Sequence, residues 1–223
     1  MAAKINASGR SMVEMLGVLA IFGLLSVIGI SGFSKAMTKY KITKLTDDIA
    51  MIVANTRTRY SQQNDYEGLN NASAISIGLV PNEMVKYNED GTLEGIVNAY
   101  NGKVWISAAK ANNADTDKKS FVISFNSLSR EACMALATND WGSAYSSGII
   151  ALRADNGSIG NSDAEAAEIM ENANYNEGCE GATSPYIACP GGKNLAIPMP
   201  PLIAVQACSC KGNECAVIFK YHH

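Results

Sequence analysis

Cysteines are the residues of this sequence best suited to chemistry. Six occur, all in the C-terminal half, at positions 133, 179, 189, 208, 210 and 215. An even number in one region suits disulfides formed in an oxidising compartment. The competing hypothesis is a metal site, because Cys208, Cys210 and Cys215 lie close together and His222 and His223 follow. Structural zinc sites favour about two to four residues between paired cysteines, whereas one serine separates Cys208 from Cys210. We therefore favour disulfides and expect no metal or cofactor.

The spacing of the cysteines narrows their pairing without settling it. Cys179 and Cys189 are flanked by glycine and proline, so a local loop between them closes easily. Cys210 and Cys215 bracket Lys-Gly-Asn-Glu, a sequence suited to a turn. The preferred set is Cys133–Cys208, Cys179–Cys189 and Cys210–Cys215. Because Cys208 and Cys210 can exchange roles, Cys133–Cys210 with Cys208–Cys215 remains the main alternative.

Enzyme motifs are missing from the sequence. The only histidines are His222 and His223, at an end that frays, so a Ser-His-Asp or Cys-His arrangement has no internal base. No phosphate-binding G-x-x-x-x-G-K-[ST] and no H-E-x-x-H occurs. The net charge of -3 provides no basic field for nucleic acid. We expect neither catalysis nor nucleic-acid binding.

A long apolar run near the N-terminus is the strongest structural signal. After Glu14 no charged residue occurs until Lys35, and residues 15–34 are mostly apolar. As a helix, this run is about 30 Å long and matches the hydrocarbon core of a bilayer. A signal peptide would have a shorter apolar region and a small-residue cleavage site after it. The run therefore predicts a retained transmembrane helix, and an ordinary single-pass anchor remains an alternative.

The pattern becomes amphipathic after Lys35. Mainly apolar residues recur at spacings of three and four, which places them on one helix face: Ile42, Leu45, Ile49, Ile52, Thr56 and Tyr60. Charged side chains, Arg57 among them, surround this stripe. No proline interrupts residues 10–63. We expect one helix of about 80 Å, with its first half in a membrane and its second half packed on a domain.

The residues just before the apolar run form a short motif. Residues 8–14 read Ser-Gly-Arg-Ser-Met-Val-Glu. This resembles the processing site of type IV prepilins, in which a polar leader ends in glycine and the fifth mature residue is glutamate. The resemblance implies cleavage by a prepilin peptidase between Gly9 and Arg10, N-methylation at Arg10 and a role for Glu14 in assembly. Arg10 departs from the family, which usually has Phe, Met or Leu there.

The chemistry expected of Glu14 also follows from its position. A carboxylate at the edge of a spanning helix costs a few kcal/mol unless it has a partner. Cleavage after Gly9 would create an ammonium on Arg10 at the same membrane depth. When subunits stack with an axial offset, Glu14 of one subunit meets the ammonium of the next. The alternative is that Glu14 lies among lipid headgroups and is hydrated.

Four stretches after residue 73 resemble type IVb major pilins: AISIGLVPNEMV, GIVNAYNGKVWIS, FVISFNSLSREACMALAT and the final Cys215–Tyr221 segment. The match covers most of residues 9–138 and the last strand, while residues 139–207 match poorly. Locally, we expect strands at Lys103–Ala108, Ser120–Asn126 and Cys215–Tyr221, and helices at Ser129–Thr138 and from Ser162 to about Asn172. Pro198, Pro200 and Pro201 indicate a stiff surface stretch.

The resemblance implies an α+β pilin fold, in which a long N-terminal helix packs on an antiparallel sheet with a disulfide-stapled C-terminal region. The expected parts are a cleaved cytoplasmic leader (1–9), a transmembrane and filament-core helix (10–34), its amphipathic continuation (35–62) and a globular head (63–223). The precursor would reside in the inner membrane and the product in an extracellular pilus.

The implied function is that of a structural subunit in a helical filament of identical copies. Its implied partners are the prepilin peptidase and the pilus assembly machinery of the inner membrane. One alternative is a minor pilin or a secretion-system pseudopilin. The other is a membrane-anchored periplasmic binding protein that never polymerises, which predicts no cleavage after Gly9 and indifference to changes at Glu14.

Overall fold

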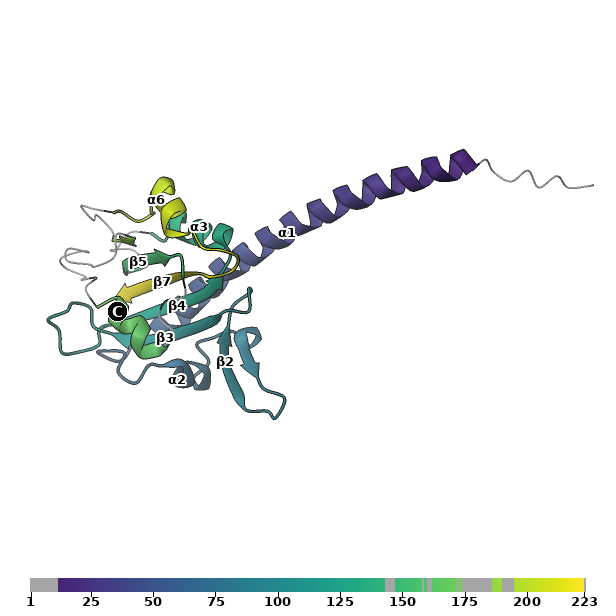
Figure 1. Ribbon diagram of the computed structural model, residues 1–223. Coiled ribbons are helices and arrows are strands. Elements are labelled where there is room, and N and C mark those ends of the chain that lie inside the picture. The colour runs from purple at the N-terminus through teal and green to yellow at the C-terminus, as the bar shows by residue number, and fades with distance from the viewer. Residues whose placement is uncertain are drawn as a thin grey trace, which may run out of the picture. The chain divides into compact units, whose positions relative to one another are not determined.

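The computed structural model describes residues 12–142, 147–157, 159, 162–171, 173, 186–189 and 195–222. The chain divides into two compact units, Met1–Tyr40 and Lys41–His223. Figure 1 labels many of their elements. Cys179, Gly9 and Arg10, to which the sequence assigns roles, lie outside the described residues.

One helix, α1, runs from Met12 to Tyr60 over 49 residues. It has the continuity that the absence of proline predicts. Helical hydrogen bonds are local, so even an apolar stretch satisfies its own backbone. The Ser26 and Thr38 hydroxyls donate to the carbonyls of Phe22 and Ser34, four residues earlier. These polar side chains are thus also satisfied within the helix.

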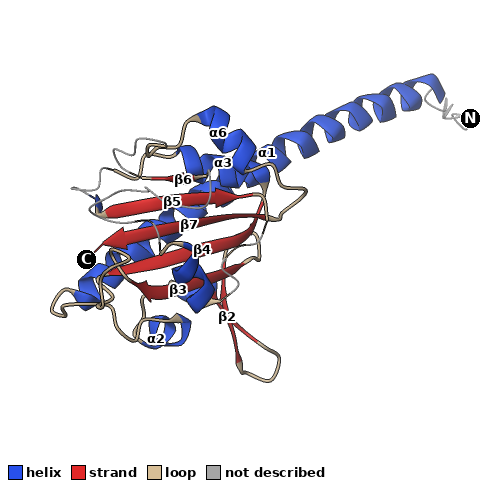
Figure 2. Cartoon of the chain, turned by 60° about the vertical axis from the view of Figure 1, so that its left-hand side comes forward, coloured by secondary structure: helices blue, strands red, loops and turns tan. Residues whose placement is uncertain are grey.

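The second unit contains a seven-stranded sheet in the described part of the chain, with the order β1-β2-β3-β4-β7-β5-β6. All neighbouring strands are antiparallel, and Figure 2 shows the C-terminal part of α1 crossing behind them. The strands are β1 (Val85–Tyr87), β2 (Leu93–Val97), β3 (Lys103–Ala109), β4 (Ser120–Leu128), β5 (Ile149–Asp155), β6 (Ile187–Ala188) and β7 (Cys215–His222). The predicted strands correspond to β3, β4 and β7, which form the middle of the sheet.

The central strands are covered on both faces. One face packs against the Lys41–Tyr60 part of α1, whose apolar stripe is confirmed: Leu45, Ile49, Ile52, Thr56 and Tyr60 are buried and Ile42 is half-buried. The other face carries a second apolar cluster with α5 (Asp163–Ile169), which packs against β3 and β4. This double burial explains why β4 reads as an almost continuous buried strand.

The shorter helices are α2 (Asn71–Ser76), a 3-10 turn at Asn82–Met84, α3 (Arg130–Thr138) and α6 (Pro201–Ala207). Ser162 caps α5 as expected. Ser129, which the sequence placed within its helix, instead caps α3; each hydroxyl accepts a backbone N–H three residues later. The predicted extent of α5 was wrong, since the helix ends at Ile169 rather than near Asn172. Beyond it, the carbonyls of Met170 and Ala173 face the Lys220 ammonium instead of continuing the helix.

The three prolines are exposed, as expected of a surface stretch, but the helix α6 that Pro201 opens was not predicted. Proline suits the first helical turn, because a backbone N–H at that position would have no intrahelical acceptor and its absence costs nothing. The strand β5 was not predicted either, although Ile149, Ile150 and Leu152 form an apolar run that a search for buried strands would have found. Both elements fall within residues 139–207, where the resemblance was weakest.

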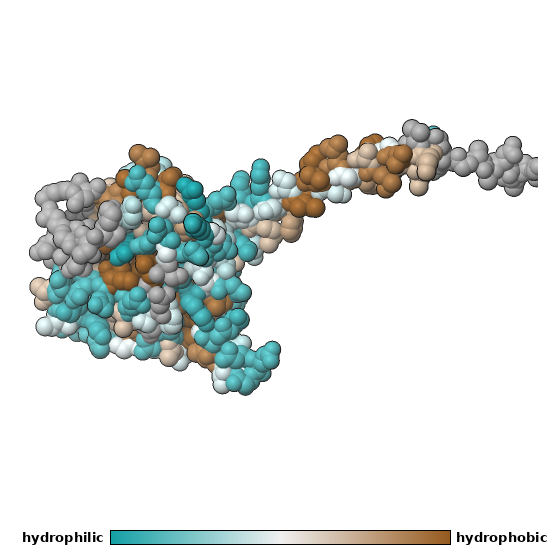
Figure 3. Space-filling model, viewed as in Figure 1, coloured by the Kyte–Doolittle hydropathy of each residue, from teal (hydrophilic) through white to brown (hydrophobic). Residues whose placement is uncertain are grey.

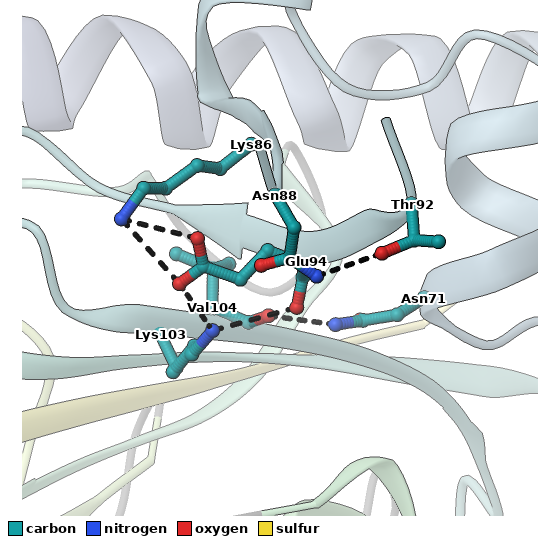
Figure 4. A network of polar contacts seen from close by, with 7 residues as sticks. All are labelled: Asn71, Lys86, Asn88, Thr92, Glu94, Lys103 and Val104. Carbon is teal, nitrogen blue, oxygen red and sulfur yellow. Dashed lines mark hydrogen bonds and ion pairs between the residues drawn. The ribbon is translucent and has the colours of Figure 1, made fainter. Parts of the chain in front are cut away.

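Side chains close the sheet where β2 separates from β3. The Asn71 amide donates to the Val104 carbonyl (2.8 Å) and accepts the Ile106 N–H (2.7 Å), taking the place of a neighbouring strand. Figure 4 shows the ion pairs that hold the hairpin beside it: the Glu94 carboxylate lies 3.1 Å from the Lys86 ammonium and 3.2 Å from that of Lys103. An edge covered in this way is protected from pairing with another chain.

Candidate assembly surface

The N-terminal part of α1 exposes apolar side chains on every side. The exposed set includes Met15, Leu16, Val18, Leu19, Ile21, Phe22, Leu24, Leu25, Val27, Ile28, Ile30 and Phe33, at 48–71% of their possible surface. The most apolar window of the helix has a mean hydropathy of 2.3, and none of it is buried within the chain. Figure 3 shows this stretch in brown. A helix that is apolar all round requires a non-aqueous environment, either a membrane or other helices.

Among the described residues, this helix alone is long and apolar enough to cross a membrane. Glycines occur in it at positions 17, 23, 29 and 32, and a methyl group added to each would meet nothing within 4 Å beyond the adjoining helix backbone. Among the described residues, these glycines therefore have no packing partner outside their own helix. Small residues at such positions allow another helix to approach closely.

Glu14 lies in the first turn of α1 and is exposed. Its charge is compatible with the positive end of the helix dipole, which favours acids in the first turn. Within the described part of the chain it has no ion-pair partner. The proposed partner, the new N-terminus on Arg10, belongs to a residue outside the described ranges. The pairing therefore remains a prediction.

Where α1 enters the second unit, a charged cluster attaches it to the loop before β1. The Lys44 ammonium contacts the Asp48 carboxylate at 2.9 Å and also pairs with Glu83. These hydrogen bonds raise the pKa of Lys44, while burial raises the pKa of Asp48. The carboxylate of Asp48 is almost fully buried, so Lys44 supplies the countercharge that its burial requires.

Arg57 attaches the same helix to the last strand. Its guanidinium donates to the Ser147 carbonyl and, at 3.3 Å, to the His222 carbonyl. It also lies 5.5 Å from the centre of the Tyr221 ring, a distance at which a cation and an aromatic face attract. The sequence grouped Arg57 with the charges around the apolar stripe, and nothing local distinguishes it from Arg59. Its partners lie 90 or more residues away along the chain.

Lys220 is a second residue whose role the sequence did not predict. It is fully buried on β7 and donates to the carbonyls of Met170 (3.0 Å) and Ala173 (2.6 Å). Desolvation lowers its pKa to about 8. The sequence did contain a signal for this role, because Lys220 lies inside the apolar segment Ala-Val-Ile-Phe-Lys-Tyr. A lysine in a buried strand needs hydrogen-bond acceptors for its ammonium group.

The disulfides lie at the C-terminal end of the head. Cys133 on α3 is bonded to Cys208 at the end of α6, and Cys210 is bonded to Cys215 at the start of β7. Cys189 is also disulfide-bonded, while Cys179 lies outside the described residues. The Sγ atoms of Cys133, Cys208 and Cys215 lie within 4.8 Å of one another, a spacing that could suit a metal. Each is already bonded to sulfur, so none provides the thiolate that a metal binds.

The expected architecture is confirmed: a long N-terminal helix, an antiparallel sheet and disulfides near the C-terminus. The family model described as PilS N terminal matches residues 39–185. Because this match spans more than half of the 223 residues, the chain belongs to that family of type IV pilins. The family and the fold are those of structural proteins.

The solved structures that are similar to this chain include two type IV pilins. The type IV b pilin from Salmonella typhi has 14% sequence identity and a TM-score of 0.48, with 81% of this chain and 99% of that chain covered. TcpA, a type IV pilin from Vibrio cholerae El Tor, has 16% identity and a TM-score of 0.46, with 81% and 98% covered. No curated protein matches the chain.

Proposed function

We propose that this pilin is the structural subunit of a type IV pilus-like extracellular filament. It is made as a membrane-inserted prepilin, cut between Gly9 and Arg10, and polymerised through α1 into a helical filament of identical subunits. The observation that carries the proposal is the helix surface from Met15 to Phe33, apolar on all sides and unburied by the chain, on a protein whose head has its own core.

Such a surface needs two environments in succession. In the precursor, a bilayer surrounds the helix, whose apolar stretch matches the hydrocarbon thickness. In a filament, the helices of other copies replace the lipid, and the open positions at the four glycines permit their close approach. Burial of the same side chains therefore stabilises both states, and extraction from the membrane costs little once neighbouring helices are available.

Glu14 favours transfer of the helix from the membrane to the filament. A carboxylate near the membrane edge gains from meeting an ammonium at the same depth. In the proposal, that ammonium is the N-terminus of Arg10 on a neighbouring subunit, created by prepilin peptidase and then N-methylated. The assembly machinery of the inner membrane completes the set of partners. Because only the processed chain carries this ammonium, cleavage is a precondition for assembly.

Purification of surface filaments provides the test. We expect mass spectrometry of sheared filaments to show a chain beginning at Arg10, without MAAKINASG. Gly9→Val should leave the uncut precursor in the membrane, because a branched side chain crowds the peptidase at that bond. An intact Met1 or Ala2 start in assembled material would contradict the processing step. Uncut protein that remains monomeric in the membrane would instead support an anchored protein that does not polymerise.

The abundance of the chain in those filaments tests whether it is the main subunit or a minor pilin. A main structural subunit should account for most of the filament mass. If the chain is instead present in a few copies among a more abundant pilin, it is a minor pilin. Quantitative mass spectrometry of the sheared material separates these two results.

A further inference from the structure

Two disulfides of the head lie against each other. Because the Cys215 Sγ is within 4.8 Å of both Cys133 Sγ and Cys208 Sγ, the Cys210–Cys215 bond has one sulfur adjacent to the whole Cys133–Cys208 bond. Disulfide exchange requires a sulfur nucleophile close to a second disulfide. The fold supplies that proximity, since Cys208 ends α6 and Cys215 opens β7.

The four sulfurs differ in access to solvent. Cys133, Cys208 and Cys215 are fully buried, whereas Cys210 is partly exposed and lies between the exposed residues Ser209 and Lys211. A thiolate arriving from solvent can therefore reach Cys210 but not the other three. Access, rather than intrinsic reactivity, determines which sulfur is attacked first.

We propose that the Cys210–Cys215 disulfide is a thiol-reactive site that gives external thiols access to the buried Cys133–Cys208 bond. Its substrate class is a thiolate, small or on a protein. The thiolate attacks Cys210 Sγ and forms a mixed disulfide there, while the Cys210–Cys215 bond breaks and its electron pair leaves on Cys215 Sγ.

The second step is internal. The Cys215 thiolate attacks Cys208 Sγ, forming Cys208–Cys215, and the electron pair of the broken Cys133–Cys208 bond leaves on Cys133. The Cys133 thiolate then attacks Cys210 Sγ, forming Cys133–Cys210 and returning the external thiolate. Two disulfides enter and two leave, so no oxidant or reductant is consumed.

Attack on Cys208 is favoured over attack on Cys133. If Cys133 were attacked, Cys208 would have to close onto Cys210 across a single serine, which disulfide geometry disfavours. The head thus interconverts the two pairings that the sequence alone leaves open, starting from one accessible atom.

The test uses the full chain in detergent micelles with reduced glutathione. Samples are quenched with iodoacetamide and mapped by mass spectrometry of peptides without reduction. We expect glutathione to appear first on Cys210, followed by peptides joined through Cys208–Cys215. Alkylated Cys133 should appear only after the Cys210 adduct, because its release depends on that adduct.

Two double variants provide matched controls. Cys210→Ala with Cys215→Ala should slow the loss of the Cys133–Cys208 bond by about tenfold or more, since that bond then has no accessible neighbour. Cys133→Ala with Cys208→Ala should leave the rate of glutathione addition at Cys210 within about twofold. If either variant fails to fold, the order of products in the unmodified chain decides.

Two results would overturn the proposal. One is alkylation of Cys133 or Cys208 before any adduct forms on Cys210. The other is a sample quenched after prolonged incubation in which Cys215 is alkylated but the Cys133–Cys208 bond is intact. Cys215 would then have been a free thiol until the quench and would not have attacked its neighbour.

Discussion

The two compact units of this protein use the same helix in opposite ways. Up to Tyr40, the large apolar side chains of α1 are exposed, and its structure depends on local backbone hydrogen bonds. From Lys41 onward, one face of α1 is buried in the head and tied to it by Lys44 and Arg57. The same apolar residue therefore has a different role in each unit. Its truncation should weaken contacts between subunits when it lies in the first unit and should weaken folding of the head when it lies in the second.

The largest expected effect concerns Glu14. Glu14→Gln should block or strongly slow filament assembly while the head stays folded, because its proposed partner belongs to another subunit. Removing one member of a buried ion pair costs about 3–5 kcal/mol, since the other charge is left uncompensated. Filament yield after shearing is the measurement. Asp47→Asn, at an exposed acid in the second unit, is the matched control and should assemble normally. A normal yield from Glu14→Gln would refute the pairing.

The next prediction compares two leucines of the same helix. Leu45 is fully buried and Leu24 is 66% exposed. Leu45→Ala should lower the free energy of unfolding of the head by about 2–5 kcal/mol, through lost burial and a cavity. Leu24→Ala should change it by less than about 0.5 kcal/mol.

Urea unfolding of the full chain in micelles measures both variants. The chain has two tryptophans, Trp105 and Trp141, and both lie in the head. Their fluorescence therefore reports head unfolding alone. Equal losses of unfolding free energy in the two leucine variants would contradict the contrast between the two units, because the exposed stretch of α1 would then contribute to the stability of the head.

The smallest expected effect is a pH dependence that is confined to the head. Burial lowers the pKa of Lys220 from 10.5 to about 8. Between about pH 8 and pH 10 the unfolded lysine keeps its proton while the folded one has released it. The unfolded state then binds more protons, so stability rises with pH, by at most about 1.4 kcal/mol per pH unit.

Lys220→Met isolates this contribution. The variant should lose the rise in unfolding free energy between about pH 8 and pH 10. Buried tyrosines such as Tyr66, whose pKa burial raises from 10.0 to about 12, lower stability only above about pH 10, where the unfolded side chain ionises. The same urea titration, repeated across the window, provides the measurement. An unchanged slope in the variant would assign the rise to another group.

The predictability of the structure follows the range of its interactions. The helix, its apolar stripe and the cap at Ser162 depend on neighbours within one or two turns, and the sequence predicts them. The strand β5 and the helix α6 were missed, although an apolar run and Pro201 provided local signals. The role of Arg57 had no local signal, because its acceptors come from the Ser147 segment and from the end of β7.

The sequence by itself determined that an apolar segment of bilayer length precedes an amphipathic one, because hydropathy and periodicity are properties of consecutive residues. It also limited the cysteines to a few reasonable pairings. Only the tertiary structure decided which sulfurs are adjacent, that Lys220 is buried against two carbonyls, and that Arg57 and Lys44 join the helix to the head. These contacts form between residues far apart in the chain, so their energies arise only when the sheet and helix have brought them together.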